Sequence, residues 1–567
     1  MTLQATASDH ALDDASVCRR RIPTALWIVA VLAAMAHLAP HWRAQLQTPA
    51  DWTYTGNLNG SPDVMQYRVW TRLSQSTGPL VPNTFTTEPN RPHLPVFFYY
   101  FVGKTSQWLH MSAEFLMAYM GAALAFIFTI IIFLTVRRFL PTPHQTWWLF
   151  GVILLGGGLG AHLKLWTELG WGEQLFVVKR MVFDATQSWP LFEDYRSHYV
   201  CATLFDTHFL LIWIVMMLSI LSIYATVLRV TVGRVACTAV CCGVMTLLHV
   251  YEGVTLIMIS AGIALVFWCR KSRRASSLVA LATCAASVGV CIGWIGALYD
   301  GSSLALPPWR ADNILVATLL IAYPVAWAVI AWGGADFWRR GGDDCCFLVG
   351  WALGCVVLTL SGPFYPYPDR GTMTLQIPLY LIAGLVYFAR RRRVGAVAAV
   401  TTVLVLGATP AFVCFVQWRG STFSEDSPHV FMSAEHATIM DSLRQRATSD
   451  HVLLVNKSDD EWKTDDLWLA PVFPGSLFGG HFFLSENYES KRAEISWFYR
   501  SRDVEQQAEF LQRRGISFVY VNARTDPVAF ARIPGVKLVS ATSVGSLFEF
   551  SGRQKRVYED DDGAEDG

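Results

Sequence analysis

Long apolar runs recur through the first 417 residues and decide what this chain can fold into. Each has close to the roughly 20 residues that an α-helix needs to cross a hydrocarbon core about 30 Å thick. The runs cover residues 22–40, 114–136, 145–163, 206–228, 235–250, 252–269, 276–298, 313–333, 345–361, 373–389 and 394–416. Charged residues make up 16% of the chain, against about 25% in soluble proteins. We therefore predict an α-helical polytopic membrane protein with about eleven transmembrane helices.

Basic residues are concentrated in alternate connections between these runs. They lie at Arg19–Arg21, Arg137-Arg138, Arg229 and Arg234, Arg270 to Arg274, Arg339-Arg340 and Arg390–Arg393. Because basic connections stay in the cytoplasm, we expect a cytoplasmic tail at 1–21 and a C-terminal domain on the opposite side. The pattern suggests a bacterial plasma membrane, although an internal membrane with its lumen outside fits equally well.

The sequence outside the runs divides into outer loops and a C-terminal domain. Within the bundle, 22–417, the loops 41–113 and 164–205 are long and aromatic, with an amphipathic piece at 94–108. Residues 418–556 alternate helical and strand patterns, which predicts a small extracytoplasmic α/β domain. Its predicted elements are helices 434–446 and 504–514, strands 451–456 and 516–522, and a hairpin of 536–540 with 545–550.

Two further patterns concern partners and polar loops. The acidic tail, 557–567, is predicted to be disordered. No basic stripe with interleaved aromatic residues occurs in the C-terminal domain, so we expect no nucleic-acid partner. The pair Asp465-Asp466 is expected to be solvated in a polar loop.

Several ionisable residues lie in the first outer loop or at the predicted outer ends of the helices. Charges in or beside membrane spans are costly and therefore suggest function. They are Asp63, Glu88, Asp206, His208, His249, Glu252, Asp369 and Arg370, with Tyr251 beside them. We expect them to approach one outer-leaflet cavity, capped by the loops and the α/β domain. Simpler interpretations stay open: Asp63 as a helix N-cap, Glu88 as a solvated turn acid, His208 as a core histidine and Arg370 as an interfacial cation.

Several short strings resemble a poorly characterised bacterial branch of the GT-C superfamily, polytopic glycosyltransferases that use lipid-linked sugars. The strings are Gly60-Ser61-Pro62-Asp63 through Tyr67, Asn83 to Pro89, His249-Val250-Tyr251-Glu252, Arg370 before Leu375 to Leu379, and Gly480-His481. GT-C enzymes have a cytoplasmic N-terminus, a catalytic acid in a long first outer loop and often a C-terminal extracytoplasmic domain. The resemblance follows most of the chain in order.

The resemblance implies an inverting transfer of a sugar from a polyprenyl-phosphate donor to a glycan, lipid or protein acceptor at the outer membrane surface. Asp63 matches the first-loop acid and would be the general base. Arg370 would bind the donor phosphate, with His208 and His249 as phosphate or metal contacts. Tyr67, Tyr251, Glu252 and His481 would contact substrate or support these groups.

Whether a divalent metal takes part in the reaction stays open. Many GT-C enzymes carry two closely spaced acids in the first loop, whereas Asp51 and Asp63 are well separated, so Glu88 is the alternative second catalytic acid.

Two other functions compete with transfer. A transporter or flippase for a lipid-linked sugar would place polar residues near the membrane midplane, on broken helices or inverted repeats. We find no repeat, and the ionisable residues lie at the outer boundary. A scaffold or sensor would not need His249, Glu252 and Arg370 together. The sequence therefore favours surface chemistry.

Overall fold

The computed structural model describes residues 22–58, 62–88, 90, 92, 94–140, 142–155, 206–298, 319, 323–361, 370–390, 430–457, 464–481 and 484–552. The predicted tails 1–21 and 557–567, the run 394–416 and the loop 164–205 lie outside the described residues. Asp369 lies outside them too.

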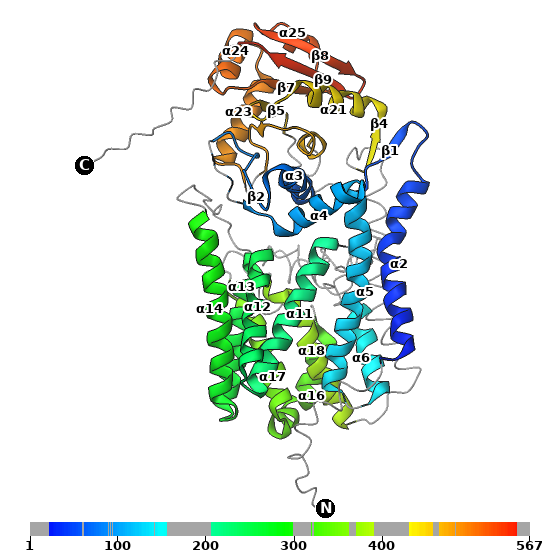
Figure 1. Cartoon of the computed structure of the whole chain (residues 1–567), viewed down its shortest axis with the longest axis vertical. Coiled ribbons are helices and arrows are strands. Elements are labelled where there is room, and N and C mark those ends of the chain that lie inside the picture. Colours follow the sequence, from blue (N-terminus) through cyan, green and yellow to red (C-terminus); the bar gives the residue numbers. More distant parts are fainter. Residues whose placement is uncertain are drawn as a thin grey trace, which may run out of the picture.

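A bundle of apolar helices forms the lower body of the molecule (Figure 1). It contains α2 (Thr24–Leu46), α5 (Ala113–Phe139), α6 (Pro143–Leu155), α11 (Thr207–Leu228), α12 (Val232–Leu248), α13 (Val250–Cys269), α14 (Arg274–Leu298), α16 (Pro324–Arg340), α17 (Asp343–Thr359) and α18 (Arg370–Arg390). Every predicted run except 394–416 overlaps one of these helices. Among the described residues, 6 helices (α2, α5, α11, α13, α14 and α18) are long and apolar enough to cross a membrane. About eleven crossings therefore remains a prediction.

Helix α16 lies further along the chain than the run 313–333 predicted, because it begins at Pro324 and extends to Arg340. Proline favours the first turn of a helix, and the terminal Arg339 and Arg340 suit the negative end of the helix dipole. The nearly touching runs at 235–250 and 252–269 are two separate helices. His249 alone, with an extended backbone, lies between α12 and α13.

Helices α13 and α17 approach each other closely in the bundle. A Cβ atom at Gly354 of α17 would lie only 2.4 Å from the carbonyl oxygen of Met258 in α13. Small residues of this kind allow membrane helices to pack backbone against backbone. The crossing is therefore closed to any larger side chain at Gly354.

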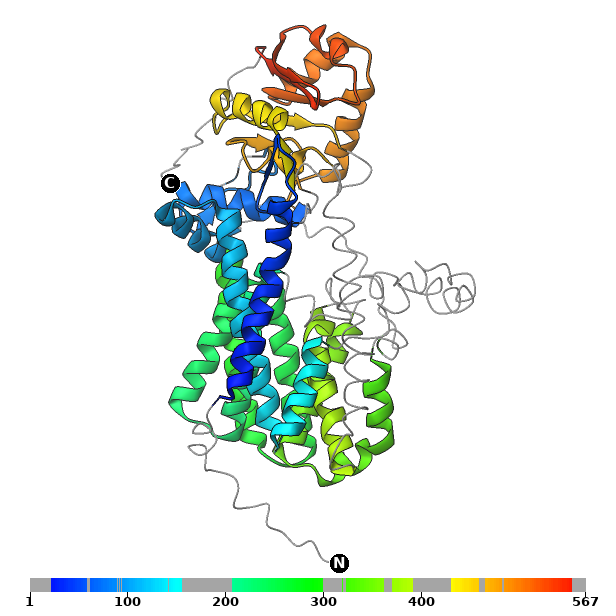
Figure 2. The same ribbon diagram turned by 90° about the vertical axis from the view of Figure 1, so that its right-hand side faces the viewer.

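Two short helices of the first outer loop lie between the bundle and the C-terminal domain (Figures 1 and 2). They are α3 (Pro62–Thr77) and α4 (Phe97–Leu109), linked by the short strands β2 (Leu80–Val81) and β3 (Leu94–Pro95). Helix α4 confirms the amphipathic piece predicted at 94–108, since Tyr99 is buried and Trp108 is exposed.

The C-terminal domain contains a five-stranded sheet in the order β6-β5-β7-β9-β8. Its strands are β5 (Val452–Val455), β6 (Ser476–Leu477), β7 (Phe518–Asn522), β8 (Val536–Thr542) and β9 (Gly545–Phe550). β5 pairs in parallel with β6 and β7, and the other pairs are antiparallel. The predicted helices are present as α21 (Ala434–Arg446) and α24 (Val504–Arg513), and α23 (Tyr488–Arg500) and α25 (Pro527–Ala531) were not predicted.

The two faces of this sheet belong to different cores. On one face, β5 contributes Val452 and Leu454 to a core with α23 and α24. On the other, Leu453 and Val455 join a core that also includes side chains of the first outer loop. That second core contains Met65, Val69 and Leu73 of α3, Phe98, Tyr99 and Val102 of α4, and Ile439, Met440 and Leu443 of α21. The outer loop is thus built into the C-terminal domain.

A separate strand pair reinforces this connection. β1 (Trp52–Tyr54) runs antiparallel to β4 (Phe431–Ser433), so the segment that follows α2 is paired with the segment that precedes α21. The pair thus joins the segment after the first bundle helix to the segment at the start of the C-terminal domain.

The α13–α17 crossing can be tested by replacing Gly354 with valine. Because the new side chain would collide with backbone atoms of α13, we expect a loss of about 1–3 kcal/mol, measured as a lower thermal midpoint in detergent. Gly293→Val in α14, where nothing lies within 4 Å, is the control. Equal midpoints for the two variants would contradict the close crossing.

Candidate functional site

Asp63 and His481 bring the first outer loop and the C-terminal domain together. Asp63 lies in the first turn of α3, one residue after Pro62, so it is part of the helix and not its N-cap. His481 Nε2 lies 3.7 Å from Asp63 Oδ1. The histidine is 1% exposed and the aspartate side chain is 58% exposed. The carboxylate therefore has a buried neighbour on one side and remains accessible on another.

The position of His481 is set by a buried ion pair next to it. Lys457 pairs with Asp466 and also donates a hydrogen bond of 2.7 Å to the carbonyl of Gly480. The His481 backbone N–H donates to Ser485 Oγ at 3.1 Å. Asp466 is buried, so the expectation that it is solvated was wrong: Lys457 supplies the charge that makes its burial tolerable.

Tyrosine and histidine rings extend from Asp63 toward the bundle. Tyr67, one turn after Asp63 in α3, stacks on Tyr99 with ring centroids 4.8 Å apart. The Tyr67 and His208 ring centroids lie 4.9 Å apart. The Tyr99 hydroxyl and His208 Nδ1 share a hydrogen bond of 2.9 Å. The buried His208 lies in the first turn of α11.

The next residues form an ion-paired group at the outer ends of α12, α13 and α18. The His208 and His249 rings are 5.8 Å apart, and His249 contacts the carboxylate of Glu252. Glu252 is 1% exposed, and its other oxygen lies 3.4 Å from Arg370 Nη1. Tyr251 packs edge-on against His249 at 5.5 Å. The buried Glu252 thus holds a histidine and an arginine together.

Close packing fixes where Arg370 begins α18. The next residue, Gly371, would place a Cβ atom 2.4 Å from the carbonyl oxygen of Cys355 in α17. A side chain at that position would push the two helices apart, so glycine lets the start of α18 lie directly against α17. The guanidinium of Arg370 is consequently held beside Glu252.

We refer to this group as the outer cluster. It comprises Asp63, Tyr67, Tyr99, His208, His249, Tyr251, Glu252, Arg370 and His481. It brings together every predicted site residue except Glu88, from α3, α11, the α12–α13 junction, α18 and the C-terminal domain. A cavity at this place remains a prediction. Tyr99 was missed, although its hydroxyl on the buried face of an amphipathic helix was a usable signal.

Opposing effects act on the Asp63 carboxyl. Desolvation by the surrounding protein raises its pKa, but the neighbouring His481, Arg370 and His208 lower it. The lowering effects prevail, so the pKa lies below its ordinary value and Asp63 is ionised at neutral pH. Burial, followed by the negative charges of Asp63 and Asp206, raises the pKa of Tyr67 well above its ordinary value, which keeps the phenol protonated.

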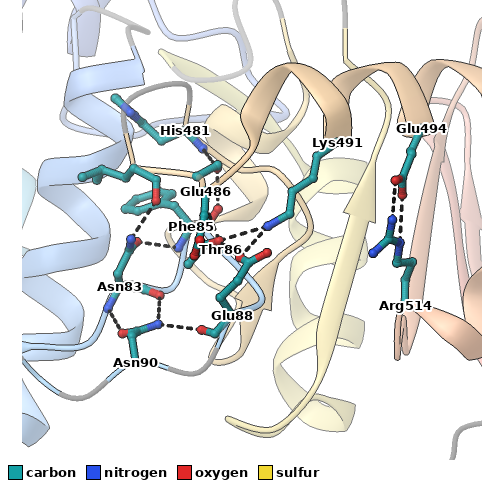
Figure 3. A network of polar contacts seen from close by, with 12 residues as sticks. Asn83, Phe85, Thr86, Glu88, Asn90, His481, Glu486, Lys491, Glu494 and Arg514 are labelled. Carbon is teal, nitrogen blue, oxygen red and sulfur yellow. Dashed lines mark hydrogen bonds and ion pairs between the residues drawn. The ribbon is translucent and has the colours of Figure 1, made fainter. Parts of the chain in front are cut away.

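Glu88 lies in a different polar network, between the first outer loop and the C-terminal domain (Figure 3). Lys491 Nζ of α23 lies 2.6 Å from Glu88 Oε2 and 3.0 Å from Thr86 Oγ1. Asn83 Nδ2 donates to the carbonyl of Leu484 at 2.7 Å. Within the described residues, Glu88 contacts no member of the outer cluster. The arrangement suits a structural role for Glu88 in docking the loop onto the domain.

The described residues include no group of three or more His, Cys, Asp or Glu side chains that could hold a metal ion. Asp206, beside His208, caps α11 by accepting the backbone N–H of Phe209 at 3.1 Å. Metal binding by His208 and His249 remains a prediction.

Comparison with solved structures finds a similar fold. The cryo-EM structure of arabinofuranosyltransferase AftD from mycobacteria matches over 94% of this chain and 40% of that chain, with a TM-score of 0.52 and 13% identity. A mutant form of AftD matches over 94% and 42%, with a TM-score of 0.52 and 14% identity. AftD is a GT-C membrane glycosyltransferase, so the GT-C resemblance is confirmed at the level of fold.

The chain spans about two fifths of the length of AftD. No protein-family model matches its sequence, and no curated protein matches it either.

The docking role of Glu88 predicts a stability effect. Glu88→Gln would leave Lys491, whose side chain is 7% exposed, without its countercharge, so we expect a loss of about 1–3 kcal/mol in chemical unfolding. Hydrogen bonds from Lys491 and Thr86 overcome desolvation and hold the pKa of Glu88 below its ordinary value. The stabilisation is therefore present above the pKa of the unfolded state and is lost as the pH falls through the folded pKa.

Glu494→Gln is the matched control, because the Glu494–Arg514 pair of the same helix is more exposed and contributes less. Equal losses from the two variants, or a Glu88→Gln effect that persists in acid, would argue against the docking role.

Proposed function

We propose that this protein is a membrane glycosyltransferase that moves a sugar from a polyprenyl-phosphate donor to an acceptor at the extracytoplasmic surface. The observation that carries the proposal is the meeting of Asp63, Arg370 and His481, from three distant parts of the chain, in the outer cluster. The GT-C fold supports the same class of reaction. The identities of the sugar and the acceptor are left open by this proposal.

In the proposed reaction Asp63 acts as general base. Its carboxylate accepts the proton of an acceptor hydroxyl as that oxygen forms a bond to the anomeric carbon of the sugar. The bond from the anomeric carbon to the phosphate oxygen breaks on the opposite side, which inverts the configuration, and the lipid phosphate leaves with the electron pair. His481 keeps Asp63 ionised by lowering its pKa, so the base is ready at neutral pH.

Arg370 would neutralise the charge that develops on the departing phosphate. A guanidinium suits this role because it stays ionised and offers several donors in one plane. Glu252 holds Arg370 at 3.4 Å and also contacts His249. The donor phosphate would therefore lie near Arg370, with His249 and His208 as further contacts. These residues stand at the ends of bundle helices, a depth that a lipid headgroup reaches.

The α/β domain and the first outer loop would then bind or cover the acceptor. They share one apolar core, and together they lie over one end of the helix bundle (Figure 2). The alternation of basic clusters along the sequence supports a position outside the cytoplasm for these two parts. We propose that the protein resides in a bacterial plasma membrane and acts on cell-envelope substrates.

The first test is sugar transfer in liposomes by the purified protein, with a panel of radiolabelled polyprenyl-phosphate sugars. We expect Asp63→Asn to lower the transfer rate about 10²–10⁴-fold without changing the thermal midpoint. Asp51→Asn, an exposed acid of the same loop, is the control and should retain activity. Equal rates for wild type and Asp63→Asn would show that Asp63 is not the general base. Donor that crosses the bilayer unreacted would indicate a transporter instead.

The role of His481 predicts a change in the pH profile. Wild-type kcat/KM should fall only in acid, below the ordinary pKa of an aspartate, because the pKa of Asp63 is lowered. In His481→Gln the lowering contribution is lost and desolvation prevails, so the acid limb should move to higher pH. His451→Gln, in the same domain, is the control. A uniform loss of rate at every pH would show that His481 has only a structural role.

A further inference from the structure

Arg72 lies in α3 on the side away from Asp63. The two residues are about two and a half helical turns apart, which places them on opposite faces of the helix. Arg72 is next to Leu73, a member of the core that α3 shares with Leu443 of α21. It therefore faces a different part of the junction between the first outer loop and the C-terminal domain.

The Arg72 guanidinium has two buried donors without an acceptor. Nε and Nη2 are both inaccessible to solvent and have no hydrogen-bond partner within the described part of the chain. A buried, unsatisfied charged donor is costly to a folded protein. Nε and Nη2 form one edge of the guanidinium, and that edge fits two oxygens of a carboxylate or phosphate.

Neighbouring acids are already engaged with other arginines. Glu114 pairs with Arg68, one turn before Arg72, at 3.0 Å. Asp441 pairs with Arg444 in α21, also at 3.0 Å. The charged group that acts on Arg72 is Arg444: burial, and after it the positive charge of Arg444, lower the pKa of Arg72 to about 10. Arg444 of α21 is therefore the cation whose charge acts on the buried Arg72.

We propose that Arg72 anchors an oxyanion-binding site between α3 and α21, with Arg444 as its second positive charge. The ligand is a phosphate or carboxylate group whose two oxygens accept hydrogen bonds from Nε and Nη2 of Arg72. The site is separate from the outer cluster and takes no part in the chemistry proposed there. A bound oxyanion would offset the repulsion between the two arginines and join the outer loop to the C-terminal domain.

Thermal unfolding of the full chain in detergent tests this site, with inorganic phosphate added at constant ionic strength. We expect phosphate to raise the wild-type midpoint, because a ligand that binds only the folded state stabilises it. Arg72→Met should unfold at a higher temperature than wild type without phosphate, since it lacks the unpaired buried charge, and its apparent phosphate affinity should be at least about tenfold weaker. Arg72→Lys keeps the charge but not the bidentate edge, and should also bind phosphate more weakly.

Arg446→Met is the control, because Arg446 of the same α21 helix is half exposed and pairs with Glu549 at 3.3 Å. Nanodiscs with and without phosphatidylglycerol distinguish the two sources of the oxyanion. A phosphate response that Arg72 variants lose identifies a soluble oxyanion, whereas a response only to phosphatidylglycerol, again lost in the variants, identifies a lipid headgroup. If neither phosphate nor phosphatidylglycerol stabilises wild type more than Arg72→Met and Arg72→Lys, the proposal is wrong.

Discussion

The apolar core shared by the first outer loop and the C-terminal domain is the constraint on which the rest of the structure depends. Helices α3 and α4 share this core with one face of the five-stranded sheet, although most of the bundle separates them from it in sequence. This packing brings His481 to Asp63 and Lys491 to Glu88. Without the core, Asp63 would lie on an isolated amphipathic helix, with no fixed neighbour to control its ionisation.

The polar residues of the outer cluster are arranged by charge as well as by position. The Glu252 carboxylate is almost completely buried, and it contacts both Arg370 and His249. The Asp63 carboxylate has a more distant neighbour in His481, and much of its surface is exposed. This difference separates a carboxylate that holds other groups in place from one that can meet a substrate. An active site needs both kinds, since positioning and proton transfer place opposite demands on a carboxylate.

The sequence was most informative where one local rule decides the structure. The 434–446 helix was predicted at its observed bounds from its local pattern, and in the structure Ser433 caps its first turn. The residues of the outer cluster could be proposed because charged residues in or beside membrane-spanning helices are costly. Long-range pairing could not be predicted: neither the partner of Glu88 nor that of Asp466 is visible without the fold. The run 313–333 was bounded by hydropathy alone, whereas α16 begins at Pro324, a residue that favours the first turn of a helix.

The pairing of β1 with β4 has a consequence for biosynthesis. Its two strands, Trp52–Tyr54 and Phe431–Ser433, are made at opposite ends of the membrane bundle. At about 5–20 residues per second, roughly 20–80 s pass at the ribosome between them. During that interval the apolar faces of α3 and α4 lack the C-terminal domain with which they share a core in the finished protein. The period of greatest aggregation risk for this protein is therefore its own translation.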